Sequence, residues 1–169
     1  MDDLAKLVAI EGVRRVKATY WYAIDTKNWD LLATVFGPDS IADFRAERDL
    51  RPGEGIDKLR PVGEALDAGD GAVAQGDAIA PWIASVAQSL ATVHHGHAPI
   101  IDILGPDDAK AVWPMFDYVD NGTSAMQGYG FYHETYRRDG DRWYIQNLVL
   151  TRLRLDGAHP ASFANGNGG

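Results

Sequence analysis

Three of the five histidines fall within four positions, at His94, His95 and His97, in a segment that otherwise has the pattern of a β-strand. Side chains alternate across a strand, so His94 shares one face with Thr92 while His95 and His97 lie on the other. The three imidazoles could converge on a metal ion only through a bulge, which Pro99 would permit. A zinc site would also require a further ligand at a recognisable spacing, and none is evident. We therefore expect no metal site.

His94 is the candidate for chemistry, because histidine works as a general base near neutral pH. The alternative is a buried neutral imidazole that hydrogen bonds satisfy. A catalytic histidine needs an orienting carboxylate, and Asp25 ends the apolar run YWYAID at the close of a predicted helix. The helix dipole disfavours a negative charge there, which suggests a carboxylate that holds a histidine tautomer. Asp25 could instead only cap the next helix.

The elements that must position these residues can be predicted from apolar periodicity. Asp2 or Asp3 would cap a long N-terminal helix, and Gly37-Pro38 would end a second one. Asp139-Gly140-Asp141 is a hairpin signal between the last two strands. The predicted helices cover residues 3–24, 28–36 and 79–90, and the predicted strands cover residues 40–45, 91–104, 109–120, 126–138 and 142–155.

Helices that precede an antiparallel meander indicate the α+β class. We expect a cone-shaped curved sheet wrapped around the N-terminal helix, with two or three helices enclosing an apolar pocket. Residues 1–158 should form a single domain. Residues 46–78 are predicted to be a long variable insertion near the pocket mouth with one helical turn near 56–66, either a binding loop or a surface excursion. Residues 159–169 are predicted to be a disordered tail.

Composition narrows the function classes. The 169 residues are 46% apolar and 24% charged, as in a soluble globular protein. The net charge of −8 argues against a nucleic-acid or anionic-membrane surface. There is no cysteine, which excludes thiolate chemistry and fits a cytoplasmic location. No apolar run approaches the ~18 residues of a membrane span, and no nucleotide or cofactor motif is present, so we expect no cofactor.

Several of these residues together resemble a known group, the SnoaL-like branch of the nuclear transport factor 2-like (cystatin-like cone) superfamily. Within it the sequence is most similar to the bile acid 7-alpha-dehydratase and scytalone dehydratase type. The likeness covers roughly residues 8–155, except the longer 46–78 region. It rests on Tyr20 with Asp25, Trp29-Asp30, His94-x-Gly96-His97-x-Pro99, Trp113, Asp117, Asp139-Gly140, Trp143-Tyr144-Ile145 and Arg152.

The resemblance implies that His94 is the catalytic base, that Asp25 is the carboxylate that partners it, and that the Tyr20 hydroxyl assists. It also implies that Asp117 lies in the pocket and that the chain forms a trimer, with a dimer as the alternative. Phe44 stands where the family has a pocket tyrosine, so one hydrogen-bond donor is missing.

Helix geometry opposes part of this assignment. Five residues on a regular helix correspond to about 140° of rotation, so Tyr20 and Asp25 would not share a face. Tyr22 or Trp21 would face Asp25 better. Either the helix unwinds near Asp25, or Tyr20 enters the pocket from another side.

The dyad suits abstraction of a proton next to a carbonyl, with Tyr20, His97 and Arg152 as candidate donors to the enolate. Arg152 could instead lie on a solvated edge, and Trp113 could be core or pocket wall. The residues expected to bind the substrate are Asp117, Trp113, His97, Arg152, Phe44 and Tyr22. The leading hypothesis is a cofactor-independent dehydratase (a lyase) for a hydrophobic polycyclic or steroid-like ketone.

Three rival functions remain open at this point. An isomerase or a polyketide cyclase would use the same base. A non-catalytic small-molecule binding module would use only the pocket. An enzyme of the epoxide hydrolase type would require Arg152 to bridge the carboxylates of Asp25 and Asp117.

Overall fold

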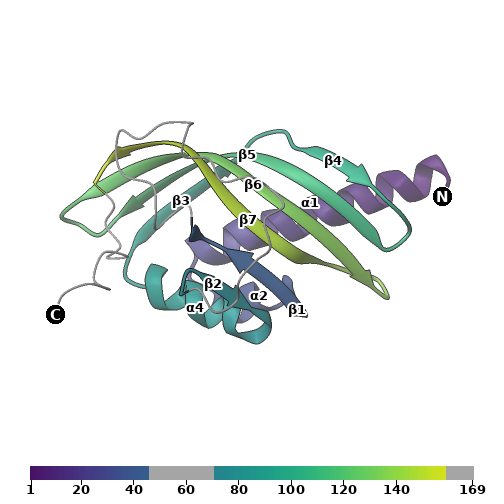
Figure 1. Ribbon diagram of the computed structural model, residues 1–169, viewed down its shortest axis with the longest axis horizontal. Helices are drawn as coiled ribbons and strands as arrows, with labels where there is room; N and C mark the ends of the chain where they lie inside the picture. The colour runs from purple at the N-terminus through teal and green to yellow at the C-terminus, as the bar shows by residue number, and fades with distance from the viewer. Residues whose placement is uncertain (46–70, 159–169) are drawn as a thin grey trace.

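The computed structural model describes residues 1–45 and 71–158. Figure 1 shows the long strands β5, β6 and β7 arching over helix α1, with α2 and α4 on the same side of the sheet. The helices are α1 (Asp3–Asp25), α2 (Trp29–Ala33) and α4 (Ile79–Ala87), and the 3-10 helix η2 (Gly76–Ala78) precedes α4. The strands are β1 (Phe36–Asp43), β2 (Val73–Gln75), β3 (Ala91–Gly96), β4 (Ile100–Ile103), β5 (Asp108–Asp120), β6 (Ala125–Asp139) and β7 (Arg142–Gly157).

One sheet contains all of these strands in the order β2-β1-β7-β6-β5-β3, and β4 pairs with the other end of β5. Every pairing is antiparallel except that of β1 with β7. The sheet is curved and does not close on itself. The predicted α+β class and the predicted cone around the N-terminal helix are confirmed.

Two predicted boundaries are wrong, and a proline lies at each. The predicted helix 28–36 is shorter, because Gly37-Pro38 belong to β1, at the place where its pairing with β7 shifts register. The predicted strand 91–104 divides into β3 and β4, with Pro99 between them. Proline has no N–H to donate to a sheet, so it interrupts regular pairing.

Part of the predicted insertion at 46–78 is regular structure. Val73–Gln75 forms β2 beside β1, and η2 leads from it directly into α4. Residues 46–70, with the helical turn predicted near 56–66, and the predicted tail at 159–169 lie outside the described residues.

Helix α1 supplies the centre of the fold. The Asp2 carboxylate caps it by accepting a hydrogen bond from the Ala5 amide at 2.7 Å, as predicted. Its buried face begins at Ala9, whereas the first apolar residues of the predicted stripe are exposed because the sheet does not cover the first two turns. These are Leu4, Leu7 and Val8. None of the described helices combines the length and the apolar character that a membrane span needs.

A charge lies within the buried stripe of α1. Lys17 is fully buried, and its Nζ lies 2.5 Å from Glu134 Oε1 on β6. The Tyr136 hydroxyl donates to the other Glu134 oxygen and accepts from Trp113 Nε1 at 3.0 Å. Burial lowers the pKa of the Lys17 ammonium to about 8, against the opposing charge and hydrogen bond of Glu134. This network ties α1 to the concave face of the sheet.

Removing one member of this pair should be costly. Lys17→Met leaves the Glu134 carboxylate buried without its counter-charge, which should lower the free energy of unfolding by about 3–5 kcal/mol in urea titrations. Lys17→Met combined with Glu134→Gln should cost less than the sum of the two single changes, because no isolated charge remains. Lys110, which forms an exposed pair with Asp102, provides the control, and Lys110→Met should change the stability little. Additive costs for the two buried changes would contradict the coupling.

Candidate active site

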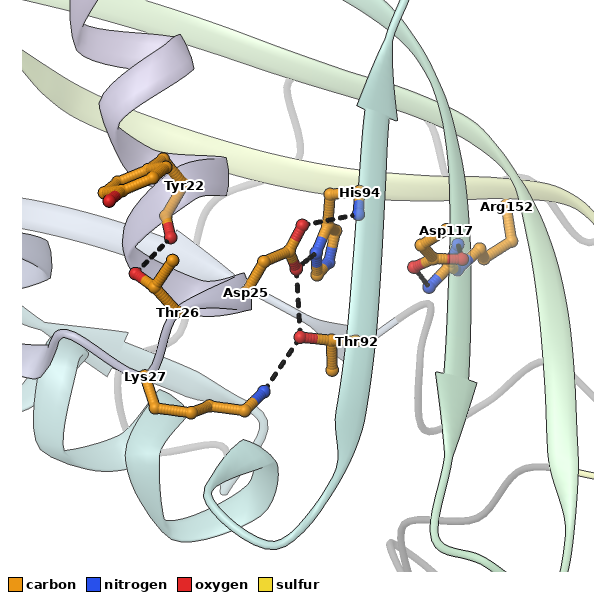
Figure 2. Close-up of polar contacts among 8 residues, drawn as sticks. All are labelled: Tyr22, Asp25, Thr26, Lys27, Thr92, His94, Asp117 and Arg152. Carbon is orange, nitrogen blue, oxygen red and sulfur yellow. Dashed lines mark hydrogen bonds and ion pairs between the residues drawn. The ribbon is translucent and has the colours of Figure 1, made fainter.

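Asp25 and His94 meet where the end of α1 approaches strand β3 (Figure 2). The Asp25 Oδ1 atom lies 2.7 Å from His94 Nδ1, and Oδ2 accepts a hydrogen bond from the His94 amide at 2.8 Å. The side chain of His94 is 9% exposed and that of Asp25 is 25% exposed. Since one carboxylate holds both the ring and the backbone of His94, the position and the orientation of the imidazole are fixed together.

Two further residues extend this contact. The Thr92 hydroxyl donates to Asp25 Oδ1 at 2.9 Å, and Lys27 Nζ donates to Thr92 Oγ1 at 2.8 Å. Burial alone would raise the pKa of the Asp25 carboxyl. The hydrogen bonds and charge of His94, with the Thr92 hydroxyl, outweigh burial and hold that pKa below its usual range. Asp25 is therefore an anion at neutral pH, and it accepts the Nδ1 proton of His94.

His94 lines a pocket between the sheet and α4, with a cavity volume of about 90 Å³. One wall is apolar and carries Phe44 stacked on Trp82, with ring centroids 4.8 Å apart and planes 11° apart. Polar groups from β3, β5 and β7 form part of the opposite wall. The pocket therefore combines a largely carbon-lined interior with a few placed polar groups, as binding sites for small molecules do.

Asp117 and Arg152 are the most deeply buried of these polar groups. Arg152 donates to both carboxylate oxygens of Asp117, at 2.8 and 2.7 Å, and both side chains are almost fully buried. Gly128 makes room for the pair, because a Cβ at that position would overlap Asp117 Oδ1 and Arg152 Nη1. The predicted placement of Asp117 in the pocket agrees with this geometry, and Arg152 lies inside rather than on a solvated edge.

Tyr20 also reaches the pocket, despite its rotation away from Asp25 along α1. Its ring is 1% exposed and packs edge-on against Phe36 and Tyr132. Asp25 is the last residue of α1 and contacts β3, while Tyr20 lies under the sheet. The two side chains therefore approach one pocket from different directions.

Three residues that were expected to bind substrate lie elsewhere. Tyr22 is 63% exposed, because two residues along a helix rotate a side chain about 200° away from Tyr20. His97 is exposed beyond the end of β3, and its amide donates to the Pro114 carbonyl. Trp113 belongs to the core under α1, where it donates to the Tyr136 hydroxyl.

Other arrangements considered from the sequence are not formed. Asp25 bonds to His94 and Thr92 while Arg152 pairs with Asp117, so within the described residues no arginine bridges the two carboxylates. Within residues 1–45 and 71–158, no three carboxylate or imidazole side chains are grouped as metal ligands would be.

Sequence reasoning missed Thr92, Lys27, Tyr132 and Trp82 as parts of the site. Thr92 could have been found, because it lies two residues before His94 and therefore on the same face of the strand. Lys27 carried no such signal. Its position depends on a turn that the sequence does not reveal.

The lowered pKa of Asp25 has a consequence in acid. The folded chain binds this proton less readily than the unfolded chain, so the stabilisation is present above about pH 4 and is lost as the pH falls further. We expect the difference in unfolding free energy between wild type and Asp25→Asn, measured by urea titration, to shrink below about pH 4. A difference that does not change with pH would mean that the carboxylate is not held as an anion.

Comparisons with known proteins agree with this fold. A probable cyclase, FGR4, from Gibberella zeae is 25% identical over 83% of this chain and 89% of its own length. A protein assigned as a scytalone dehydratase from Novosphingobium aromaticivorans superposes with a TM-score of 0.70 at 17% identity, over 98% of both chains. A type 2 hexachlorocyclohexane dehydrochlorinase superposes with a TM-score of 0.71 at 15% identity, over 98% of this chain and 99% of its own.

The structural likenesses show the nuclear transport factor 2-like fold, while the nearness to a bile acid dehydratase stays a prediction. The family model described as the SnoaL-like domain matches residues 5–149, which is most of the sequence. The chain therefore belongs to the SnoaL-like domain family.

Proposed function

We propose that the chain is a cofactor-independent lyase, a dehydratase that removes a proton next to a carbonyl group of a hydrophobic polycyclic substrate. The observation that carries this proposal is the 2.7 Å contact of Asp25 with His94 Nδ1, at a histidine that lines a largely apolar pocket. A carboxylate that holds one ring nitrogen leaves the other as the basic one.

The reaction would proceed in two balanced steps. His94 Nε2 takes a proton from the carbon next to the carbonyl, and the electron pair of that C–H bond forms an enolate. When the enolate collapses, the β-hydroxyl group leaves with the proton that His94 carries, so the products are water and a conjugated ketone. Asp25 stabilises the imidazolium between these steps without accepting its proton.

The developing negative charge on the enolate oxygen needs placed donors. The cation of Arg152, held by Asp117, and the hydroxyl of Tyr20 line the same pocket as His94. Both are therefore candidates to offset that charge. Since Phe44 contributes only a stacked ring to the opposite wall, we assign it to binding of the substrate skeleton.

The lining favours a flat, neutral ligand. The side of α4 that faces the pocket is apolar, and the stacked rings of Phe44 and Trp82 offer a planar surface. The net charge of −8 would not attract an anion from solution. A hydroxylated polycyclic ketone combines the flat skeleton with the carbonyl that the mechanism requires.

A cyclase is the second candidate, because the curated relative from Gibberella zeae is a probable cyclase. Proton abstraction next to a carbonyl also begins an intramolecular condensation, so the same dyad could serve. Mass spectrometry separates a dehydratase from an isomerase, since dehydration removes the mass of water from the substrate and isomerisation leaves the mass unchanged. A condensing cyclase can also release water, so NMR of the product, which shows whether a new carbon–carbon bond has formed, separates it from a dehydratase. A binding module would retain ligand without converting it.

The trimer rests on the family resemblance alone, and we propose it on that basis. Sedimentation velocity of the full chain tests it directly, and a monomer across the concentration range would contradict it.

The dyad assignment can be tested with a panel of hydroxylated polycyclic ketones. We expect His94→Ala to lower kcat by about 10²–10⁴-fold, since positioned proton transfer contributes that much. Asp25→Asn should also lower kcat strongly, because the amide no longer fixes the tautomer of His94. His95→Ala supplies the matched control, because it removes an imidazole from the opposite face of the same strand.

Circular dichroism should show that all three variants remain folded. Turnover that survives at the wild-type rate in both His94→Ala and Asp25→Asn would refute the proposed mechanism. Equal losses in His95→Ala would attribute the effect to damage of strand β3 rather than to the dyad.

A further inference from the structure

The Asp25 carboxylate is surrounded by donors. Oδ1 receives His94 Nδ1 at 2.7 Å and the Thr92 hydroxyl at 2.9 Å, while Oδ2 receives the His94 amide at 2.8 Å. The Thr92 hydroxyl in turn lies 2.8 Å from Lys27 Nζ (Figure 2). Four groups, from the end of α1, from the turn that follows it and from β3, therefore form one connected chain of hydrogen bonds.

The chemistry of these groups fixes the direction of that chain. An ammonium group can only donate, and a hydroxyl group has a single proton. Because Lys27 donates to Thr92 Oγ1, the proton of the Thr92 hydroxyl is directed to Asp25. A proton on Asp25 Oδ1 could be accepted by His94 Nδ1 at 2.7 Å, but the lowered pKa of the Asp25 carboxyl places that proton on the imidazole instead. The arrangement thus holds Asp25 as an acceptor and requires His94 to carry its proton on Nδ1.

The backbone of Lys27 supports a dedicated role for its side chain. Its φ is 58°, and it is the single non-glycine residue with positive φ in residues 1–45 and 71–158. Glycine or asparagine is the usual occupant of this left-handed region, because a larger side chain crowds the backbone there. The turn that contains Lys27 also ends α1, with the Asn28 amide donating to the Ala23 carbonyl at 2.8 Å. This strained turn directs the ammonium group toward Thr92.

The other charged groups near the dyad do not replace Lys27. Asp117 on β5 pairs with His94 in the sheet register, but its charge is matched by Arg152 from β7. Among residues 1–45 and 71–158, the remaining titratable groups that line the pocket are the hydroxyls of Tyr20 and Tyr132. Helix α4 contributes no titratable residue. Of the lysine and arginine side chains in the described part of the chain, Lys27 is therefore the one that reaches Asp25 through Thr92, and burial lowers the pKa of its ammonium against the opposing charge of Asp25.

We propose that Lys27 and Thr92 are positioning residues, a relay that keeps Asp25 an ionised acceptor and thereby fixes the Nδ1–H tautomer of His94. This inference rests on the proposed role of His94 as the base. Neither residue takes part in proton transfer to the substrate. Both act through Asp25, so their loss should lower kcat more than it changes KM.

The test does not need a substrate. Long-range ¹H–¹⁵N spectra of the full chain report which nitrogen of His94 is protonated, and a ¹³C titration of the Asp25 carboxyl reports when it ionises. In Thr92→Val and Lys27→Met, Asp25 should titrate at a higher pH than in wild type, and His94 should show a mixture of tautomers. Thr92→Ser retains the hydroxyl and should restore both wild-type readings.

Two lysine variants separate positioning from stability. Lys27→Gly removes the side chain and relieves the positive φ, so it should be at least as stable as wild type and yet show the altered Asp25 titration. Lys6→Met removes the same charge near the start of α1, about 30 Å along the helix from Asp25, and should leave both readings unchanged.

With a converted substrate in hand, Thr92→Val and Lys27→Met should each lower kcat by about tenfold or more while KM stays within about twofold. Wild-type titration of Asp25 and a single His94 tautomer in both variants would overturn the relay, even if dyad variants prove that His94 is the base. Altered spectra in a chain that converts no substrate would leave the relay standing and reject the proposed function.

Discussion

The carboxylate of Asp25 joins the end of the long helix to the edge strand β3, and the geometry of the pocket depends on this contact. β3 is the last strand in the sheet order, so within residues 1–45 and 71–158 its outer backbone groups have no neighbouring strand. Asp25 satisfies one of them, the amide of His94, while it also holds the imidazole. An exposed edge of a sheet is usually a liability. Here the edge is used to place a histidine, because one side chain both covers the backbone and orients the ring.

Two buried ion pairs elsewhere in the cone also hold side chains in fixed positions. Lys17 with Glu134 and Asp117 with Arg152 are two ion pairs in which nearly every charged atom is removed from water. Such pairs contribute little net stability when they are compared with apolar packing. They do restrict geometry, because each group must stay with its partner. The first pair ties α1 to β6, and the second fixes a cation in the pocket that His94 also lines. The interior is therefore held in one arrangement around the space that a substrate would fill.

This arrangement explains why one fold can serve several related reactions. Dehydration, isomerisation and cyclisation next to a carbonyl all begin with removal of a proton and formation of an enolate. In the proposed mechanism the dyad supplies the base, and Arg152 and Tyr20 line the same pocket, where they could balance the charge of the oxygen. The outcome then depends on the substrate, namely on whether a leaving group or a second carbonyl lies within reach of the enolate. Differences in the apolar wall would change that outcome without altering the dyad.

The sequence by itself determined the α+β class, the face of β3 on which His94 lies, and the order of the main helices and strands, although it missed β2 and joined β3 to β4. These follow from local rules of periodicity and alternation, which a single sequence displays. It also singled out Asp25, because an acid at the end of an apolar helix calls for a reason. The placements of Tyr22, His97 and Trp113 needed the structure, since rotation around α1 and position along the strands decide which groups meet in the pocket.

The relay of Lys27 and Thr92 was decided by tertiary structure alone. It joins residues 65 positions apart through a turn with a positive φ, and no periodic pattern encodes either feature. Residue types and local spacing could name the proposed base and its partner. Only the folded chain could show what surrounds the partner, because hydrogen bonds between distant segments depend on three-dimensional geometry rather than on sequence spacing.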